Sequence, residues 1–343
     1  MKFIREVEGP SIRDLIASML FSRQQALWLS NENPILTGSG KAAIALVLNY
    51  LKKTNVIRAK TDKVLMAQWL GYWVYNQVNE FARPVFSTIE KDIKVIIPYH
   101  QYGFPQDMVS IQQFAESIGA VVIEDCAHAL YMRSISEQNN FTANNLRIYS
   151  ISKYIFCFAL GAVVGGDKSF TEYANIQIIN SSTYVTKFNN FVKYLNEMYL
   201  SGKLIDLALW NNLLAMSYAL YGKGFKPSDG AIRLMNLHID DEISSRLKRY
   251  SIYRERFAHL DIECYLGRTD VAPYVIPLKL SVDKMQLIMT SLQLAGFQTG
   301  IYRFDVNRNM LDPKFEKVLW VLVHSGISDS LFQKQLEIIE KLV

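Results

Sequence analysis

The chain has few cysteines, a small net charge and no long hydrophobic run. Its three cysteines are far apart and lack the spacing of a metal site, so we interpret them as reduced thiols. The net charge of +5 is spread along the chain, which argues against a dedicated nucleic-acid-binding protein and suits a partner with one or two phosphates. No run reaches the roughly 18 apolar residues of a membrane span. We therefore expect no metal, no nucleic acid and no membrane as partners.

The beginning of the sequence also lacks the features of a secretory leader. Residues 1–8 include acidic side chains where a signal peptide has its apolar region, so we expect a cytoplasmic protein. The 343 residues are 50% hydrophobic, which is typical of a globular chain with a sizeable core and about two domains.

Short apolar runs alternate with helical patterns over the first half of the chain. Strands are expected at 63–66, 84–86, 95–97, 120–125, 147–151 and 161–164, and helices at 40–52 and 107–117. This alternation predicts an α/β fold with a mainly parallel central sheet and flanking helices. Ligands of such sheets bind outside the carboxyl ends of the strands.

The second half of the chain has a different character. Residues 168–225 are expected to form several helices that cross the large domain. A long helix at 231–260 follows, and then strands at 274–279 and 319–323 with helices at 283–295 and 330–342. We predict a large α/β domain over residues 1–230 and a small C-terminal α+β domain over residues 231–343.

Two expected strand ends carry residues with a shared chemistry. Asp125 ends an apolar run, and Lys153 follows the next expected strand. Pyridoxal phosphate needs a lysine amine that condenses with its aldehyde and a carboxylate that keeps its pyridine nitrogen protonated. An aspartate that caps a helix and an ordinary surface lysine are the competing interpretations. The apolar residues 154–162 favour a partly desolvated, more nucleophilic amine at Lys153.

Other residues could complete a cofactor site. The backbone at Gly40, Lys41 and Ala42 opens the helix at 40–52, where N–H groups and the helix dipole attract phosphate, although small residues before a helix are more often only a cap. The Lys41 amine adds a charge suited to phosphate. Ser150 could donate to phosphate or to the local backbone. His128 could reach the cofactor ring or its phenolic oxygen.

An aromatic cluster follows the strand at 63–66. It consists of Trp69, Tyr72, Trp73 and Tyr75. One of these rings could stack on the pyridine face of the cofactor, and they could equally be core or interface anchors.

Four segments of the chain are distinctive. They are KVIIPYHQYGFPQDM at 94–108, AVVIEDCAHA at 120–129, SGKAA at 39–43 and VLVHSGIS at 321–328. These segments resemble, in the same order, IIPVHLYGQPADM, VIEDAAHA, the phosphate turn SGTAA and LPLHPGLS of the DegT-type sugar aminotransferases, and the first of them is the most specific. Members of that family depend on pyridoxal phosphate and have the fold type I architecture.

The resemblance implies a role for each candidate residue. Lys153 would bind the cofactor and then move a proton between cofactor and substrate carbons. Asp125 would pair with the pyridine nitrogen, and His128 would contact the phenolic oxygen. The cofactor phosphate would be held by Gly40, Lys41, Ala42 and Ser150. His324 is a candidate substrate contact and equally a structural residue.

The resemblance also implies an activity and partners. The family transfers an amino group from glutamate or a similar donor to a keto-sugar on a nucleoside diphosphate, for surface glycans such as lipopolysaccharide or for antibiotic sugars. Its members are usually homodimers whose active sites the partner subunit completes. We therefore expect a nucleotide-sugar substrate, an amino-acid donor and a homodimer.

Several positions depart from the family pattern. Lys41 replaces the usual Thr of the phosphate turn, and the loop that ends at Lys153 is shorter. Ala231 replaces an Asn that would contact phosphate of the partner subunit. The position of the stacking ring is Gly71, with Trp69 and Trp73 as possible substitutes. These departures motivate an alternative, a degenerate member that acts as a binding or scaffold protein. A sugar dehydratase of this fold would typically have His in place of Lys153.

Overall fold

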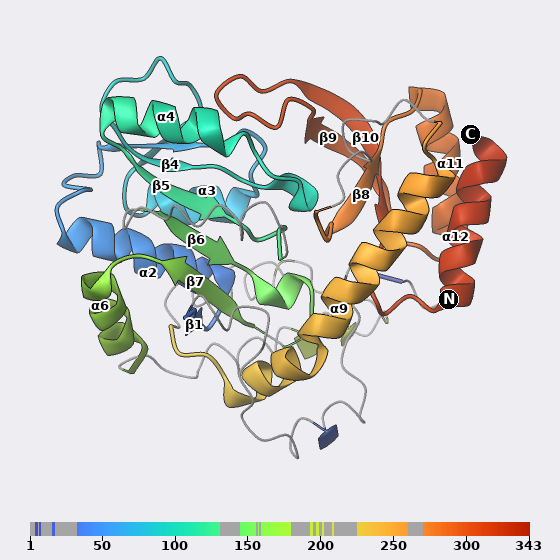
Figure 1. Cartoon of the computed structure of the whole chain (residues 1–343), viewed down its shortest axis with the longest axis horizontal. Helices are drawn as coiled ribbons and strands as arrows, with labels where there is room; N and C mark the ends of the chain where they lie inside the picture. The colour runs from blue at the N-terminus through green and yellow to red at the C-terminus, as the bar shows by residue number, and fades with distance from the viewer. Residues whose placement is uncertain are drawn as a thin grey trace.

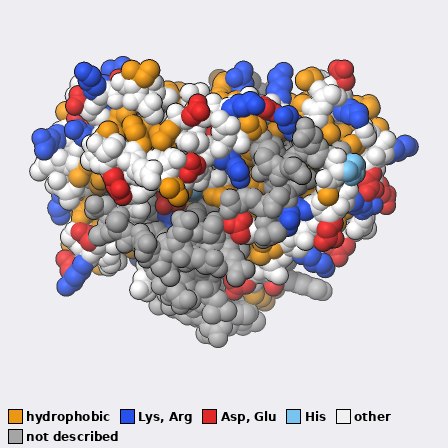
Figure 2. All heavy atoms as spheres, turned by 45° about the horizontal axis from the view of Figure 1, so that its top comes forward, with side chains coloured by type: hydrophobic (Ala, Val, Ile, Leu, Met, Phe, Trp, Pro, Cys, Tyr) orange, Lys and Arg blue, Asp and Glu red, His pale blue; other side chains and the backbone are white. Residues whose placement is uncertain are grey.

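The computed structural model describes residues 33–130, 145–179 except 156 and 158, 225–259 and 270–343, with a few short stretches elsewhere. A large sheet covered by helices lies at one end of the molecule, and a small sheet with two helices lies at the other (Figure 1). Cationic and anionic side chains are interspersed on the face shown in Figure 2, as expected from the small net charge.

The large sheet has seven strands in the order β1-β7-β6-β5-β4-β2-β3. Their bounds are β1 (Ile35–Thr37), β2 (Lys63–Met66), β3 (Arg83–Val85), β4 (Ile93–Ile97), β5 (Val121–Asp125), β6 (Leu146–Tyr149) and β7 (Gly161–Gly165). The strands β3, β2, β4, β5 and β6 pair in parallel, whereas β7 is antiparallel to both β6 and β1. The predicted α/β fold with a mainly parallel sheet is confirmed.

Helices cover the two faces of this sheet. They are α2 (Gly40–Lys53), α3 (Tyr72–Asn79), α4 (Met108–Ile118) and α6 (Lys168–Ile179). The Ser39 and Asp107 side chains cap the first turns of α2 and α4, and α4 ends at Gly119 in the left-handed conformation that favours glycine. The apolar face of α2 packs on the sheet, where Ala43, Leu46 and Val47 are fully buried.

The small sheet has three antiparallel strands in the order β8-β10-β9. These are β8 (Val275–Leu278), β9 (Gly300–Asp305) and β10 (Phe315–Leu322), with helices α11 (Val282–Leu294) and α12 (Asp329–Leu342) beside them. The long helix α9 (Asp229–Arg256) extends from below the large sheet to α11 beside the small sheet (Figure 1). One buried cluster joins Tyr149 of β6 to Leu234 of α9 and Val321 of β10, so this part of the core extends from the large sheet to the small sheet.

Some elements of the structure were not predicted from the sequence, and some predictions fall outside the described residues. The strands β1 and β9 and the helix α3 were not predicted. The division into two domains at residue 230 stays a prediction. Of the helical region predicted at 168–225, α6 is described, and most of the remainder lies outside the described residues. Cys126 and Cys157 are free buried thiols, and Cys264 lies outside the described residues. Over the described part of the chain, no helix is long and apolar enough to cross a membrane.

Candidate active site

Asp125 and Lys153 lie at the carboxyl ends of neighbouring parallel strands. Asp125 ends β5 and pairs with Ile148 of β6, and Lys153 closes a short 3-10 helix, η3 (Ile151–Lys153), shortly after β6. Asp125 is 2% exposed, and one of its carboxylate oxygens accepts the N–H of Ala127 at 2.9 Å. Burial raises the pKa of Asp125, and the charge of Lys153 acts in the opposite direction. A cationic partner is therefore what this buried carboxylate needs.

His128 connects to Lys153 directly. The Lys153 Nζ lies 2.8 Å from His128 Nε2, and the Tyr99 hydroxyl is hydrogen-bonded to His128 Nδ1. The imidazole stacks on the Tyr274 ring, with 4.3 Å between centroids and 15° between planes. Burial, together with the charges of Lys153 and Arg246, lowers the pKa of His128 well below its usual value. The imidazole is consequently neutral near pH 7.

The predicted phosphate turn is tightly packed against the lysine loop. A Cβ atom at Gly40 would lie 2.8 Å from the Ser150 Cβ, so the Ser150 side chain sits directly on the turn. A Cβ atom at Gly161 would lie 2.5 Å from the Gly40 nitrogen. The N–H of Ala42 donates to the Ser39 side chain at 3.1 Å, so it serves as part of the cap. Close approach of backbone is what a phosphate cradle at a helix N-terminus requires.

Two amines converge beside this turn. Burial and the charge of Lys153 lower the pKa of Lys41 to about 7, and the Lys41 Nζ lies 4.7 Å from the centroid of the Trp73 ring. Two neighbouring amines oppose each other's protonation, and an anion between them would favour the charged form of both. The donor set of turn backbone, Ser150 hydroxyl and Lys41 amine therefore fits a phosphate group.

Trp69 contacts residues of the small sheet. Its side chain is 44% exposed, the Arg303 guanidinium lies 4.4 Å from its ring centroid, and its ring meets Phe315 edge-on at 6.2 Å. These contacts join the segment after β2 to β9 and β10. Stacking of Trp69 on the cofactor stays a prediction, and Trp73 is the tryptophan that lies at the Lys41 amine.

Comparisons with known proteins identify the family of the chain. The model of the DegT/DnrJ/EryC1/StrS aminotransferase family matches residues 82–315. The chain belongs to this aminotransferase family. With that membership, the predicted cofactor, pyridoxal 5'-phosphate, is confirmed. No curated protein sequence matches the chain.

Solved structures of this aminotransferase architecture are similar over the whole chain. DesV from S. venezuelae is 15% identical, with 99% of this chain and 98% of that chain covered and a TM-score of 0.63. PseC from Helicobacter pylori is 13% identical, with 99% of both chains covered and a TM-score of 0.64. Spr1654 from Streptococcus pneumoniae in its PLP form is 14% identical, with 99% of this chain and 100% of that chain covered and a TM-score of 0.61. At these identities the likeness confirms the fold.

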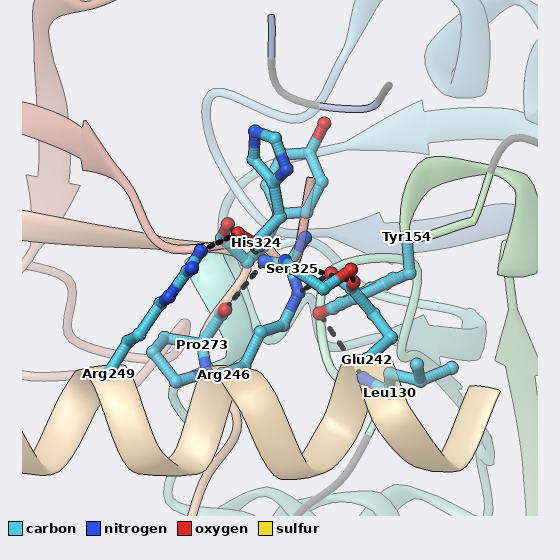
Figure 3. Close-up of polar contacts among 9 residues, drawn as sticks. Leu130, Tyr154, Glu242, Arg246, Arg249, Pro273, His324 and Ser325 are labelled. Carbon is cyan, nitrogen blue, oxygen red and sulfur yellow. Dashed lines mark hydrogen bonds and ion pairs between the residues drawn. The ribbon is translucent and has the colours of Figure 1, made fainter. Parts of the chain in front are cut away.

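A buried polar network of this aminotransferase lies between α9 and the lysine loop (Figure 3). Arg246 is fully buried, pairs with Glu242 at 2.5 Å, and donates to the carbonyl oxygens of Pro273 and Tyr274 at 2.8 and 2.5 Å. Its guanidinium also lies 4.6 Å from the centroid of the Tyr154 ring. The network therefore holds Tyr274, on which His128 stacks, close to Tyr154, the residue that follows Lys153.

Glu242 completes this network on its other side. Its second carboxylate oxygen accepts the N–H of Ser325 at 3.1 Å and the hydroxyl of the same residue. Burial alone would raise the pKa of Glu242, but Arg246, Ser325 and nearby charges lower it below its usual value. Sequence reasoning missed Glu242, Arg246 and Tyr274, although an i, i+4 acid–base pair on an expected helix was a visible signal.

His324 lies beside this network and is 2% exposed. Its carbonyl oxygen accepts a hydrogen bond from Arg249, and its ring points away from α9 (Figure 3). Burial, with the charge of Arg246, lowers the pKa of His324 to about 4. A contact of His324 with substrate stays a prediction, since the ring is enclosed by protein.

The buried His324 gives a testable dependence of stability on pH. Its pKa of about 4 in the folded state is below the unfolded value of about 6.5, so the unfolded chain binds more protons between these pH values. Its contribution is complete above about pH 6.5 and is lost as the pH falls toward 4. The loss should be on the order of 3 kcal/mol, from 1.36 kcal/mol for each pKa unit.

Urea unfolding of wild type and His324→Gln at a series of pH values tests this expectation. The wild-type free energy of unfolding should fall more steeply between pH 7 and pH 4 than that of the variant. His128, which also has a lowered pKa, is present in both proteins, so the difference between them isolates His324. If the free energies of unfolding of the two proteins changed with pH in parallel, the lowered pKa of His324 would be contradicted.

A second polar cluster joins β4 to β5. His100, Glu124 and Cys126 are buried and have ligand atoms within 4.8 Å of one another. The His100 ring is already engaged on both sides, because Nε2 bonds Glu124 at 3.2 Å and Nδ1 accepts the N–H of Gln106 at 3.1 Å. We interpret this cluster as a structural link that holds the end of β5, and so Asp125, in place.

Proposed function

We propose that this aminotransferase moves an amino group from glutamate or a similar amino acid to a keto-sugar attached to a nucleoside diphosphate, in surface-glycan, lipopolysaccharide or antibiotic sugar synthesis. The observation that carries the proposal is the convergence of Asp125, His128 and Lys153 at two neighbouring strand ends, beside a helix N-terminus suited to phosphate. PseC, which has the same fold, is an aminotransferase involved in the biosynthesis of pseudoaminic acid.

The residues at the two strand ends would hold the ring of the cofactor. When bound, pyridoxal phosphate supplies an aldehyde for the exchange of amino groups and a ring that accepts electrons. Asp125 would stabilise a protonated pyridine nitrogen. Its buried carboxylate has lost its contacts with water, and a cationic neighbour would compensate for that loss. His128 would donate to the phenolic oxygen. Lys153 would hold the cofactor covalently and afterwards carry a proton between carbon atoms.

The turn before α2 would hold the cofactor phosphate. The backbone of Gly40 and the first turn of the helix would donate N–H groups, and the Ser150 hydroxyl lies against Gly40. The Lys41 amine would be charged in this complex, since an anion raises the proton affinity of a neighbouring amine. The Ala42 N–H donates to Ser39, so we propose that Ala42 contributes mainly by shape.

Further parts of the proposal follow from family membership. We propose a cytoplasmic homodimer in which the partner subunit completes each site, with large and small domains at 1–230 and 231–343. His324 and Trp69 are proposed as contacts of substrate and cofactor that a bound complex would test. Nucleic acid and membrane are not part of the proposed function.

Absorption spectroscopy of the purified protein tests the proposal. Addition of pyridoxal phosphate should produce the yellow band of the lysine-bound cofactor, and glutamate should then convert it to the colourless pyridoxamine form. Asp125→Asn should bind the cofactor and convert it more slowly, because the pyridine nitrogen loses its charged partner. A protein that takes up no pyridoxal phosphate would favour the alternative of a binding or scaffold protein. A protein that binds the cofactor but ignores every amino donor would overturn the proposed activity.

A further inference from the structure

We propose that Tyr99 is a positioning residue that fixes the proton of His128 on Nε2, so that this N–H points at Lys153 Nζ and the lysine amine accepts it as an uncharged base. The inference deepens the proposed function, since it concerns the state in which Lys153 meets an aldehyde. It rests on a chain of two hydrogen bonds, from Tyr99 to His128 Nδ1 and from His128 Nε2 to Lys153 Nζ at 2.8 Å.

The direction of the hydrogen bond between Tyr99 and His128 determines which nitrogen of His128 carries the proton. Among the described residues, His128 Nδ1 is the partner of the Tyr99 hydroxyl. A phenol keeps its proton near pH 7, and desolvation with the charge of Asp125 raises the pKa of Tyr99 further. The hydroxyl therefore has one proton to donate, and Nδ1 is the acceptor that the structure offers to it.

The second hydrogen bond then has only one consistent direction. A neutral imidazole has a single N–H, so a ring that accepts at Nδ1 must donate at Nε2. The atom that faces Nε2 is Lys153 Nζ, which can accept only as an uncharged amine. An uncharged amine is the form that attacks an aldehyde. Tyr99 thus acts on Lys153 through His128.

Aromatic neighbours surround the His128 ring and hold its plane. Tyr274 lies on one face, and Tyr102 is stacked in parallel at 6.1 Å with 12° between planes. Tyr102 is itself stacked on Phe304 at 5.7 Å. The residue after Tyr102 is Gly103, which has φ 95°. A Cβ atom at Gly103 would lie 2.8 Å from the His128 carbonyl oxygen, so the backbone at Gly103 packs closely against the backbone of His128.

Charges on three elements face this chain of hydrogen bonds. Asp125 at the end of β5 favours a charged Lys153, whereas Lys41 on α2 opposes it. Arg246 on α9 opposes a charge on His128. Asp125 and Lys41 therefore act on the charge of Lys153 in opposite directions, and the hydrogen bond from His128 would add to the effect of Lys41.

Nitrogen NMR of the cofactor-free full chain, with ¹⁵N-labelled histidine, tests the proposal directly. The chain has five histidines, and the signals absent in His128→Gln assign His128. In wild type we expect the proton on Nε2 and none on Nδ1. In Tyr99→Phe we expect the ring to shift toward the Nδ1–H form, and Tyr302→Phe, which removes an exposed hydroxyl, should leave it unchanged. A wild-type ring protonated on Nδ1 would overturn the proposal without any use of the variant.

A second measurement follows the lysine itself. Labelling of cofactor-free protein by an amine-reactive reagent, quantified for each peptide, should be about fivefold slower at Lys153 in Tyr99→Phe, as expected for one lost hydrogen bond of about 1 kcal/mol. The exposed Lys168 serves as internal standard. Equal labelling of Lys153 in both proteins would overturn the inference. Neither readout uses the cofactor, so failure of the proposed function would appear separately, as a protein that does not bind pyridoxal phosphate.

Discussion

Replacement of Lys153 by alanine is expected to reduce amino transfer by at least about 10³-fold. Lys153 is the amine that meets His128 and interacts with both Asp125 and Lys41. The variant loses the covalent hold on the cofactor and the group that carries the proton between carbon atoms. Because the turn at Gly40 and the carboxylate of Asp125 are unchanged, the cofactor should still bind, without the yellow band of the lysine-bound form.

Steady-state transamination and absorption spectra of the variant measure this effect. Lys168→Ala is the matched control, since its side chain is 91% exposed at the start of α6 and is not one of the candidate site residues. A Lys153→Ala protein with more than a tenth of wild-type activity would contradict the role of Lys153. A loss of the same size in Lys168→Ala would show that the assay reports folding and not chemistry.

Replacement of Arg246 by methionine is expected to lower the free energy of unfolding by about 3–5 kcal/mol. The change leaves Glu242 buried with a charge that has lost its partner, and it frees the carbonyl oxygens of Pro273 and Tyr274. Because Arg246 also packs on Tyr154, the segment after Lys153 loses a support. Loss of Arg246 should therefore affect stability strongly.

Urea unfolding of the cofactor-free chain measures this loss. Lys248→Met is the matched control, because it makes the same kind of change on an exposed face of α9. A double variant, Glu242→Leu with Arg246→Met, should be less destabilised than Arg246→Met alone, since it buries no unpaired charge. A loss below about 1 kcal/mol for Arg246→Met would contradict a network that stabilises the fold.

The alternation of apolar runs and helical patterns was enough to predict the α/β class. Strands such as β5 are buried on both faces and are followed by turn residues, so local sequence marks both their existence and their ends. Asp125 and Lys153 could be placed together for the same reason, because parallel neighbours bring their carboxyl ends to one edge of the sheet. The strand direction of β7 could not be predicted, since it depends on pairing with β1.

Contacts between distant segments explain what the sequence did not reveal at the site. Tyr274 is far from His128 in the sequence but stacks on it, and Trp69 contacts Arg303 and Phe315 of the small sheet. No local pattern specifies such partners, because aromatic residues at these positions fit a core, an interface or a ligand equally well. Tyr99 lies within the most specific motif, but its hydrogen bond to His128 could not be predicted without knowing the positions of the two strand ends.

Reduction with borohydride in the presence of pyridoxal phosphate, followed by peptide mass spectrometry, tests the central claim most directly. Reduction fixes the cofactor to the lysine that holds it. The structure predicts the cofactor mass on Lys153, which contacts His128 and interacts with Asp125 and Lys41. Lys41 is the natural competitor, because its pKa of about 7 also makes it reactive. Cofactor mass on Lys41 in place of Lys153, or on neither residue, would contradict the account.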